Sequence, residues 1–265
     1  MSEIKTISIL GCGWYGFALA QNLVKSGYRI KGSSTASDKL QKFREAGIEP
    51  FEVNFGPGTD RYPPDFFQTD LLIISIPPKR SSGEAGLYPE KIRQIKTVVQ
   101  KSGIKRVLFI SSTGVYGDKN QEVDEDTTPQ PESESGKAME AAEIILKDQN
   151  DFKLTILRFG GLIGPNRDPA RFFTGKKNIP NGLAPVNLIH LDDCIGVSKA
   201  IIENNAFGYT FNACSQTHPQ RMQFYTQAAI KSGMPVPEFI DELKEWKIVK
   251  SKYLNEVLHY KTAEL

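Results

Sequence analysis

Residues 5–26 read KTISILGCGWYGFALAQNLVKS, and this stretch decides the fold. An apolar run is followed by a GxGxxG turn and then by a segment with helical spacing. In such a unit the first glycine permits a tight turn, the second lets the backbone approach a pyrophosphate, and the third lets the helix pack close to the strand. The sequence therefore predicts a dinucleotide site on Gly11, Cys12, Gly13, Trp14, Tyr15 and Gly16.

Strands and helices continue to alternate beyond this turn. Apolar runs without strict alternation predict buried parallel strands near residues 5–10, 28–32, 70–76, 105–111 and 152–158. Helical spacing predicts helices near residues 17–26, 36–46, 88–102 and 134–149. This order is typical of an α/β protein with a Rossmann-like, doubly wound parallel sheet.

The alternation breaks at about Gly160, where a loop rich in Gly, Pro, Asn and Arg begins. Later elements are expected near 186–190 (strand), 192–204 (helix), 208–213 (strand) and 219–233 (helix), with a short strand and helix at the end. We predict an NAD(P)-binding Rossmann domain over residues 1–160 and a small substrate-binding lobe over 161–265, interleaved with the end of the sheet.

Composition narrows the function classes. Thirty-three basic and 31 acidic residues give a net charge of +2, which offers no electrostatic basis for a nucleic-acid or membrane partner. The three cysteines have no metal-ligand spacing, so we expect no metal site and a reducing compartment. The longest apolar stretch, residues 71–76, is too short to span a bilayer. A cytoplasmic protein is expected.

The end of the second strand indicates the form of the cofactor. NAD sites usually place an acid there for the ribose hydroxyls, whereas NADP sites place hydroxyl and basic groups around the 2′-phosphate. The first acid here, Asp38, comes late; the hydroxyl residues are Ser33, Ser34 and Thr35, flanked by Lys31 and Lys39. NAD(P) is therefore the predicted cofactor, with NADP favoured. The hydroxyls have an alternative role as a turn and a helix N-cap.

Two later strand ends should reach the same crevice. They carry Ser75-Ile76-Pro77, which we expect at the cofactor, and the hydroxyl cluster Ser111-Ser112-Thr113. Hydroxyls at this place can hydrogen-bond the carbonyl or alcohol of a substrate.

The segment SSTGVYG, residues 111–117, resembles the SSxxVYG segment of the extended short-chain dehydrogenase/reductases, the NAD(P)-dependent nucleotide-sugar epimerases and dehydratases. Three later segments agree with that superfamily in order: residues 157–165 with LRxxxxxGP, 189–193 with IHVxD, and 209–212 with its YN strand. The resemblance covers nearly the whole chain. It implies hydride transfer on a nucleotide sugar or another secondary alcohol.

The resemblance also implies catalytic roles. Ser112 corresponds to the hydroxyl that binds the reacting sugar oxygen, and Lys137 to the lysine of the Y-x-x-x-K motif, which binds the nicotinamide ribose. The tyrosine position holds Ser133, whose hydroxyl is too weak an acid to act in its place. Thr113 or Tyr116 is the candidate for the missing acid; Tyr116 has the alternative role of packing beside the cofactor.

Three arginines surround the loop that resembles the substrate loop of the superfamily. Planar guanidinium groups at Arg158, Arg167 and Arg171 suit the phosphates of a nucleotide sugar, although an ion pair or a solvated loop would also explain them. We interpret His190 as a packed strand residue and Asp192 as a helix N-cap.

Two functions follow from these patterns. The first is an NAD(P)-dependent epimerase, dehydratase or reductase with an altered catalytic centre and a small-molecule substrate. The second is a non-catalytic NAD(P)-binding sensor or scaffold, which Ser133 favours.

Overall fold

The computed structural model describes residues 3–56, 61–78 and 84–265. The chain divides into two compact units that interleave along the sequence. The first unit consists of residues 1–111, 133–157 and 198–210, and the second of residues 112–132, 158–197 and 211–265.

A seven-stranded sheet runs in the order β10-β7-β5-β4-β1-β2-β3. Its strands are β1 (Thr6–Leu10), β2 (Arg29–Ser34), β3 (Glu49–Glu52), β4 (Leu71–Ile74), β5 (Arg106–Ser112), β7 (Lys153–Phe159) and β10 (Thr210–Ala213). The strand β1 pairs in parallel with both β2 and β4, so the order reverses beside it. This is the switch point of a doubly wound sheet, and it confirms the predicted Rossmann-like fold.

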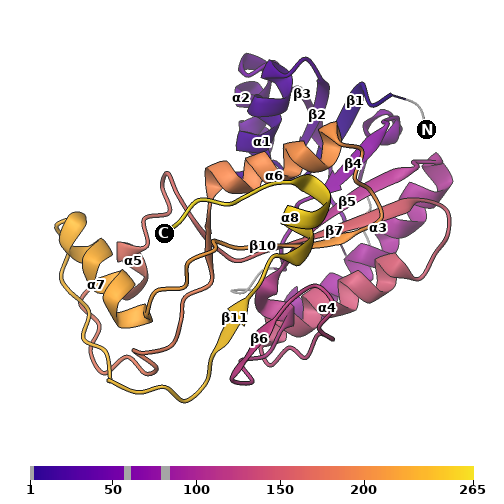
Figure 1. The fold of residues 1–265 in the computed structure, drawn as a ribbon. Coiled ribbons are helices and arrows are strands. Elements are labelled where there is room, and N and C mark those ends of the chain that lie inside the picture. The colour runs from indigo at the N-terminus through magenta and orange to yellow at the C-terminus, as the bar shows by residue number, and fades with distance from the viewer. Residues whose placement is uncertain (1–2, 57–60, 79–83) are drawn as a thin grey trace. The chain divides into compact units, whose positions relative to one another are not determined.

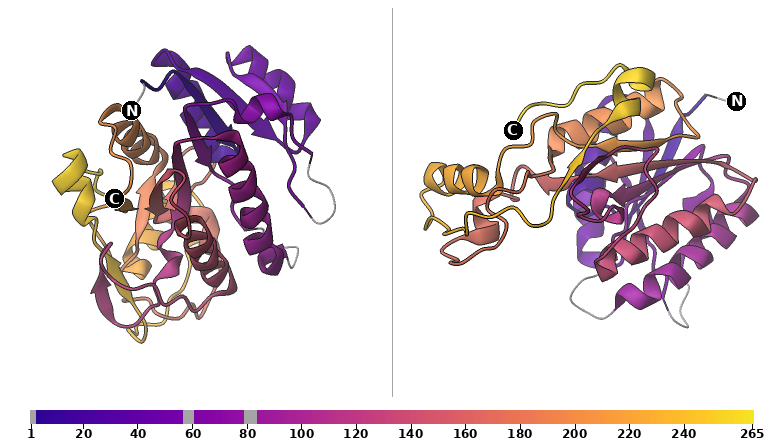
Figure 2. Two further views of the ribbon diagram at one scale, coloured as in Figure 1. Left: turned by 90° about the vertical axis from the view of Figure 1, so that its right-hand side faces the viewer. Right: turned by 60° about the horizontal axis from the view of Figure 1, so that its bottom comes forward.

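Helices cover both faces of this sheet, and α3 and α4 lie side by side on one of them (Figure 1, Figure 2). The helices in chain order are α1 (Trp14–Lys25), α2 (Leu40–Glu45), α3 (Tyr88–Ser102), α4 (Glu134–Lys147) and α6 (Leu191–Glu203). The helix predicted near 88–102 is α3, which buries Ile92, Ile95, Val98 and Val99 along one stripe and ends at Gly103, where φ is +69°.

Burial explains which strands the sequence could reveal. All four residues of β4 are fully buried, as expected for a central parallel strand covered on both faces. The short strand β3 was not predicted because its residues are all half-buried and include Pro50. The helix predicted from residue 36 starts at Leu40, because Ser37–Lys39 forms a separate 3₁₀ turn.

The second unit is built on short elements. The strand β6 (Gln121–Val123) pairs in parallel with β11 (Lys247–Val249), and β8 (Gly161–Ile163) pairs in parallel with β9 (Leu188–His190). Its helices are α5 (Ala170–Phe173), α7 (Arg221–Lys231) and α8 (Lys252–Leu258). One core cluster joins β8, β9, α5 and α7 through Ile163, Val186, Leu188 and Tyr225, with Phe173, Phe224 and Phe239 packed against them.

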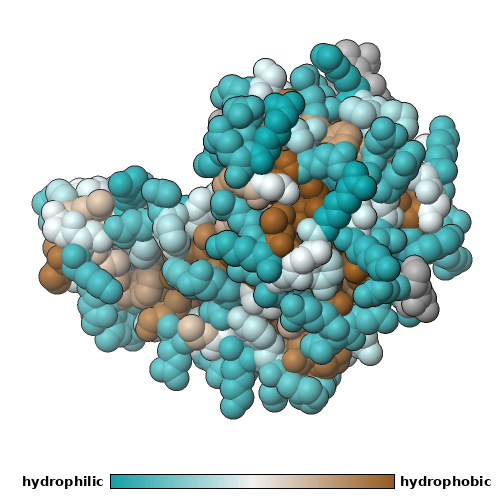
Figure 3. All heavy atoms as spheres, turned by 90° about the horizontal axis from the view of Figure 1, so that it is seen from above, coloured by the Kyte–Doolittle hydropathy of each residue, from teal (hydrophilic) through white to brown (hydrophobic). Residues whose placement is uncertain are grey.

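Surface hydropathy is mixed. The face drawn in Figure 3 carries mostly hydrophilic side chains, with smaller hydrophobic patches between them. Among the described residues, no helix combines the length and the apolar character needed to cross a membrane.

Candidate functional site

The three motif glycines serve different purposes. Gly11 has φ +100°, and a Cβ there would lie 2.7 Å from Ile76 Cγ2. A Cβ on Gly16 would lie 2.4 Å from the carbonyl oxygen of Gly11, so the fold itself requires both of these glycines. Gly13 has φ −79°, and a Cβ there would meet no heavy atom of the described residues within 4 Å. Its open side is the space that a pyrophosphate needs.

Residues of β2 hold the glycine loop in place. The Gly11 N–H donates to Ser33 Oγ at 3.0 Å, and the Cys12 N–H donates to the Ser33 carbonyl at 2.9 Å. Ser33 is buried, so its hydroxyl supports the loop. Gly13 is the N-cap residue of α1 and brings no side chain to that end of the helix. The N–H groups of the first turn therefore face the loop as in anion sites.

A cavity of about 660 Å³ lies beside this loop in the first unit. Nine of the predicted cofactor residues line it together: Gly11, Cys12, Gly13, Ser33, Ser34, Thr35, Ser75, Ile76 and Pro77. Two other walls of the cavity could not be expected from the sequence: residues 53–56 after β3, and the start of α3, including Tyr88 and Lys91. The buried Tyr88 hydroxyl donates to the Ile76 carbonyl at 2.7 Å, and burial raises the pKa of Tyr88.

The two lysines that flank the β2 hydroxyls have different environments. Lys31 is buried, and its Nζ donates to the carbonyl oxygens of Asp65 at 2.5 Å and Gln68 at 2.8 Å. Burial lowers the pKa of Lys31. Lys39 is exposed and lines the cavity. Of this pair, Lys39 is therefore the cation that a phosphate in the cavity can contact.

The remaining loop residues pack into the first unit. Tyr15 is buried on α1, where its hydroxyl lies 2.6 Å from Ser198 Oγ, and Trp14 begins that helix. The Cys12 thiol is buried, and burial raises its pKa to about 12. A thiol in this environment stays protonated and unreactive near neutral pH, in agreement with the packing role expected for a small turn residue.

Ser133, which the resemblance places at the superfamily tyrosine, has a structural role. Ser133 is the N-cap of α4, and its Oγ accepts a hydrogen bond from the Gly136 N–H at 3.1 Å. Serine is a preferred residue at this position because it satisfies one of the free N–H groups of the first turn. One turn along, Lys137 is half-exposed with its Nζ 2.9 Å from Glu134 Oε1. Its ribose contact stays a prediction.

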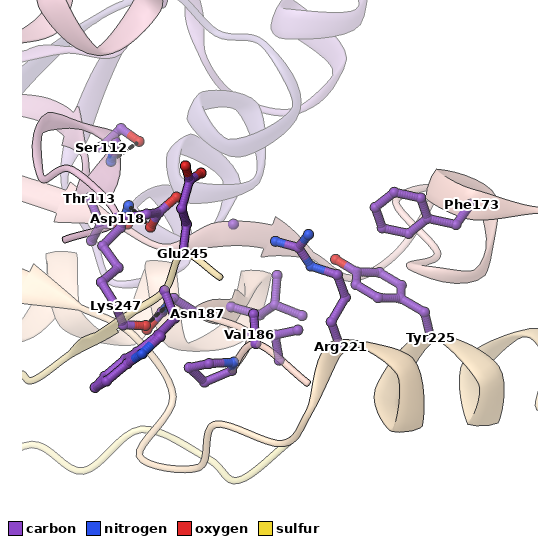
Figure 4. Close-up of a pocket in the computed structure, with 16 residues that line it drawn as sticks. Ser112, Thr113, Asp118, Phe173, Val186, Asn187, Arg221, Tyr225, Glu245 and Lys247 are labelled. Atoms are coloured by element: carbon purple, nitrogen blue, oxygen red, sulfur yellow. Dashed lines mark hydrogen bonds and ion pairs between the residues drawn. The ribbon is translucent and has the colours of Figure 1, made fainter. Parts of the chain in front are cut away.

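A second cavity, of about 360 Å³, lies within the second unit (Figure 4). Ser112 and Thr113 line it, as do Asp118, Phe173, Val186, Asn187, Arg221, Tyr225, Glu245, Trp246 and Lys247. Ser112 Oγ accepts from the Gly114 N–H at 3.1 Å, which leaves the hydroxyl proton for a ligand in the cavity.

Tyr116 and Arg158 form a buried pair instead of facing a ligand. The Tyr116 hydroxyl accepts from Arg158 Nη1 at 2.6 Å and donates toward the Asp124 carbonyl at 2.7 Å, with Asn212 Oδ1 at 3.1 Å. Both side chains are 2% exposed. Burial raises the pKa of Tyr116, although Arg158 opposes this. Both side chains are therefore engaged within the protein, and this geometry does not favour the acid role of Tyr116 or the phosphate contact of Arg158, which stay predictions.

The other two predicted arginines, Arg167 and Arg171, are both exposed. A backbone bridge pairs Arg167 with Gly164 before α5, and Arg171 is the second residue of that helix. The arginine that lines the cavity is Arg221, the first residue of α7. No motif marks it in the sequence. Near it, burial raises the pKa of Tyr225, and Arg221 acts in the opposite direction.

His190 and Asp192 have local roles. The Asp192 N–H donates to His190 Nδ1 at 3.3 Å, where β9 passes into α6. The structure corrects both expectations: the His190 side chain is 40% exposed, and Asp192 is the second residue of α6, which begins at Leu191, so it is not the N-cap.

Comparisons with known proteins agree with this arrangement. Residues 92–213 match the NAD dependent epimerase/dehydratase family, and residues 6–100 match the family described as NADP oxidoreductase, coenzyme F420-dependent. Protein YeeZ of Escherichia coli K12 is 34% identical over 247 residues, which cover 92% of this chain and 90% of YeeZ.

Two solved structures share the fold at low identity. UDP-glucuronic acid 4-epimerase from Bacillus cereus, in complex with NAD, has a TM-score of 0.79 and 19% identity, covering 98% of this chain and 94% of its own. MoeE5 in complex with UDP-glucose and NAD has a TM-score of 0.78 and 16% identity, with the same coverage. Together with YeeZ and the motifs described above, the family match identifies this chain as a member of the NAD dependent epimerase/dehydratase family.

Proposed function

We propose that the protein binds NADP in the cavity of the first unit and acts on a nucleotide sugar or another secondary alcohol by hydride transfer. The observation that carries the proposal is Gly13, a glycine that the fold does not need and that faces open space at the start of a helix. When bound, the cofactor supplies or accepts the hydride. Every other role falls to side chains and backbone groups of this chain.

The residues around the first cavity fit a dinucleotide. The N–H groups of the glycine loop and of the first turn of α1 would hold the pyrophosphate, and Ser75 to Pro77 would flank it. Ser34, Thr35 and Lys39 stand where an NAD site has its acid, which favours a 2′-phosphate. The match of residues 6–100 to an NADP oxidoreductase family supports the same choice.

The second cavity supplies the groups that a sugar substrate requires. Ser112 would orient the reacting oxygen with its free proton, and Arg221 would contact a phosphate. Because MoeE5, a protein of similar fold, was solved both with UDP-glucose and with UDP-glucuronic acid, a nucleotide sugar is the substrate class that we favour.

A non-catalytic NAD(P)-binding sensor is the second candidate. One observation favours it: the tyrosine position is filled by a helix-capping serine, so the usual proton donor is missing.

Calorimetric titration of the protein with NADPH and with NADH tests the proposed cofactor. We expect NADPH to bind at least about tenfold more tightly than NADH, since a hydrogen bond to a charged group contributes about 1.5–3 kcal/mol and each 1.4 kcal/mol changes an affinity tenfold. Incubation with UDP-glucose or UDP-glucuronic acid, followed at 340 nm, tests for turnover. If neither dinucleotide binds, both candidate functions fail; binding without turnover favours the sensor.

A further inference from the structure

An enzyme of this kind needs a proton donor beside Ser112, and the two tyrosine positions do not supply it. Ser133 caps a helix, and the hydroxyl of Tyr116 is held by Arg158 and the Asp124 carbonyl. Any donor must be a titratable group that lines the same cavity as Ser112. This inference rests on the proposed hydride transfer and asks which residue completes it.

Lys247 is a half-buried cation in the wall of that cavity. Its side chain is 13% exposed, and its Nζ donates to the Tyr116 carbonyl at 2.9 Å and to Asp118 Oδ1 at 2.8 Å. An ammonium has three N–H donors, and these two contacts account for two of them. The third is available to a ligand. Figure 4 shows the side chain extending toward Asp118 on the side of the cavity where Thr113 and Ser112 lie.

The backbone of Lys247 is fixed on both sides. On one side β11 pairs with β6, with Lys247 opposite Gln121. On the other side, the Asn187 side-chain amide hydrogen-bonds to the backbone of β11. Its Nδ2 donates to the Lys247 carbonyl at 2.9 Å, and its Oδ1 accepts from the Val249 N–H at 2.8 Å. A functional group placed by a paired strand and a side-chain clamp loses little entropy when it meets a ligand.

We propose that Lys247 gives the proton to the reacting oxygen of the substrate, in place of the tyrosine that the chain lacks. In the reducing direction, the carbonyl carbon takes a hydride from NADPH, while the Nζ–H bond breaks and an O–H bond forms on the oxygen that Ser112 orients. The products are the alcohol, the oxidised cofactor and a neutral amine. The amine takes a proton from water beside Asp118, which is half-exposed.

Other groups in the cavity are less suited to this step. Asp118 is already the ion-pair partner of Lys247. Tyr225 is separated from this end: Figure 4 shows it beside Arg221 and Phe173, away from Ser112. Burial also raises the pKa of Tyr225, which weakens it as an acid.

Kinetics of four variants test the assignment, with NADPH and UDP-4-keto-6-deoxyglucose as the carbonyl probe. We expect K247M to lower kcat by about 10² to 10⁴ without changing the dissociation constant of NADPH. K247R is the decisive variant, because arginine keeps the charge and the contacts of the wall but cannot release its proton. K247R should therefore be as stable as the wild type but keep a low kcat. Y225F should raise KM, and K250M, at an exposed lysine of the segment after β11, should match the wild type.

A second measurement does not depend on turnover. Trace acetylation of lysines, read by peptide mass spectrometry, should show Lys247 protected at least threefold when UDP-glucose and NADP⁺ are present, whereas Lys250 keeps its labelling. Protection of neither lysine overturns the assignment.

The kinetic outcomes separate this assignment from the proposed function. It is overturned if K247R recovers kcat, if Y225F carries the loss of kcat instead, or if a protein that binds NADPH does not reduce the probe. Failure to bind either dinucleotide overturns the proposed function itself.

Discussion

The two cavities are assembled in opposite ways. The first is lined by the glycine loop, by residues that follow strands and by the start of α3, and its described lining residues all lie between Leu10 and Gln94. The second is walled by side chains from segments spread between Ser112 and Lys247. Backbone shape depends on glycines at fixed spacing, which a sequence displays. Side chains brought together by topology leave no such mark, so the ligand of the first cavity could be predicted more fully than that of the second.

The strongest test of the first cavity is Gly13→Ala. The added methyl group fits the fold, since its Cβ meets no described atom within 4 Å, but it enters the space assigned to the pyrophosphate. We expect a misfit of about 1–3 kcal/mol, which raises the dissociation constant of NADPH about 10- to 100-fold.

The matched control for this variant is Gly86→Ala, at an exposed glycine whose added Cβ also meets no described atom within 4 Å. Both variants should unfold at the wild-type temperature. If Gly13→Ala bound NADPH with wild-type affinity, the role assigned to the first cavity would be contradicted, because ligand binding would then not require a glycine in the loop.

Tyr116→Phe tests whether the second unit depends on side-chain partners. Removal of the hydroxyl leaves Arg158 Nη1 and the Asp124 carbonyl without this buried partner, which should cost about 1–3 kcal/mol of unfolding free energy. Urea unfolding measures it. The exposed Tyr253, whose hydroxyl contacts Asp126, serves as the control, and Tyr253→Phe should change stability by less than about 0.5 kcal/mol. Equal effects of the two variants would contradict the role assigned to the buried pair.

Lys39→Met sharpens the assignment of the first cavity. It should weaken NADPH binding about fivefold to tenfold and leave NADH binding unchanged, because only the 2′-phosphate requires the cation. Lys42→Met, on α2 with its Nζ 4.6 Å from the ring centroid of Phe17, should change neither affinity. An equal loss for both dinucleotides would place Lys39 near a part that they share.

The smallest effect concerns the buried thiols. Burial raises the pKa of Cys12 and of Cys214 from 9.0 to about 12. A raised pKa in the folded state gives stability that is complete below pH 9 and declines as the pH rises toward 12, since unfolded thiols ionise first. By pH 9.5 the loss should be on the order of 1 kcal/mol or less per thiol. Urea unfolding of C12A/C214A should show a flatter decline between pH 8 and pH 9.5 than the wild type.

Much of the fold could be predicted because its central strands are buried on both faces. The strands β4 and β5 show this as continuous apolar runs of four residues. Elements of only three or four residues, such as β3 and β8, are too short to show a periodicity. The order of the strands agrees with the Rossmann-like fold that the glycine turn predicts. That residues 198–210 belong to the first compact unit depends on how the chain packs, and no local sequence pattern shows it.

The candidate site could be predicted where its residues lie within one sequence motif. Ser112 was found from its distance to Tyr116 in the sequence, yet the same pattern could not reveal that Arg158 engages the tyrosine hydroxyl from 42 residues away. Arg221 and Lys247 belong to no motif, and only the fold of the second unit brings them to one cavity with Ser112. The lysines beside β2 looked equivalent in sequence, whereas Lys31 is satisfied by two buried carbonyl oxygens.

The pairing of β6 with β11 sets an order on biosynthesis. Gln121 pairs with Lys247, so this ladder cannot form until nearly the whole chain has left the ribosome. By the time residue 94 has been synthesised, all described lining residues of the first cavity are present in the nascent chain. A nascent chain therefore carries the glycine turn long before it carries a complete second cavity, and any chain cut short before residue 247 lacks the strand that closes it.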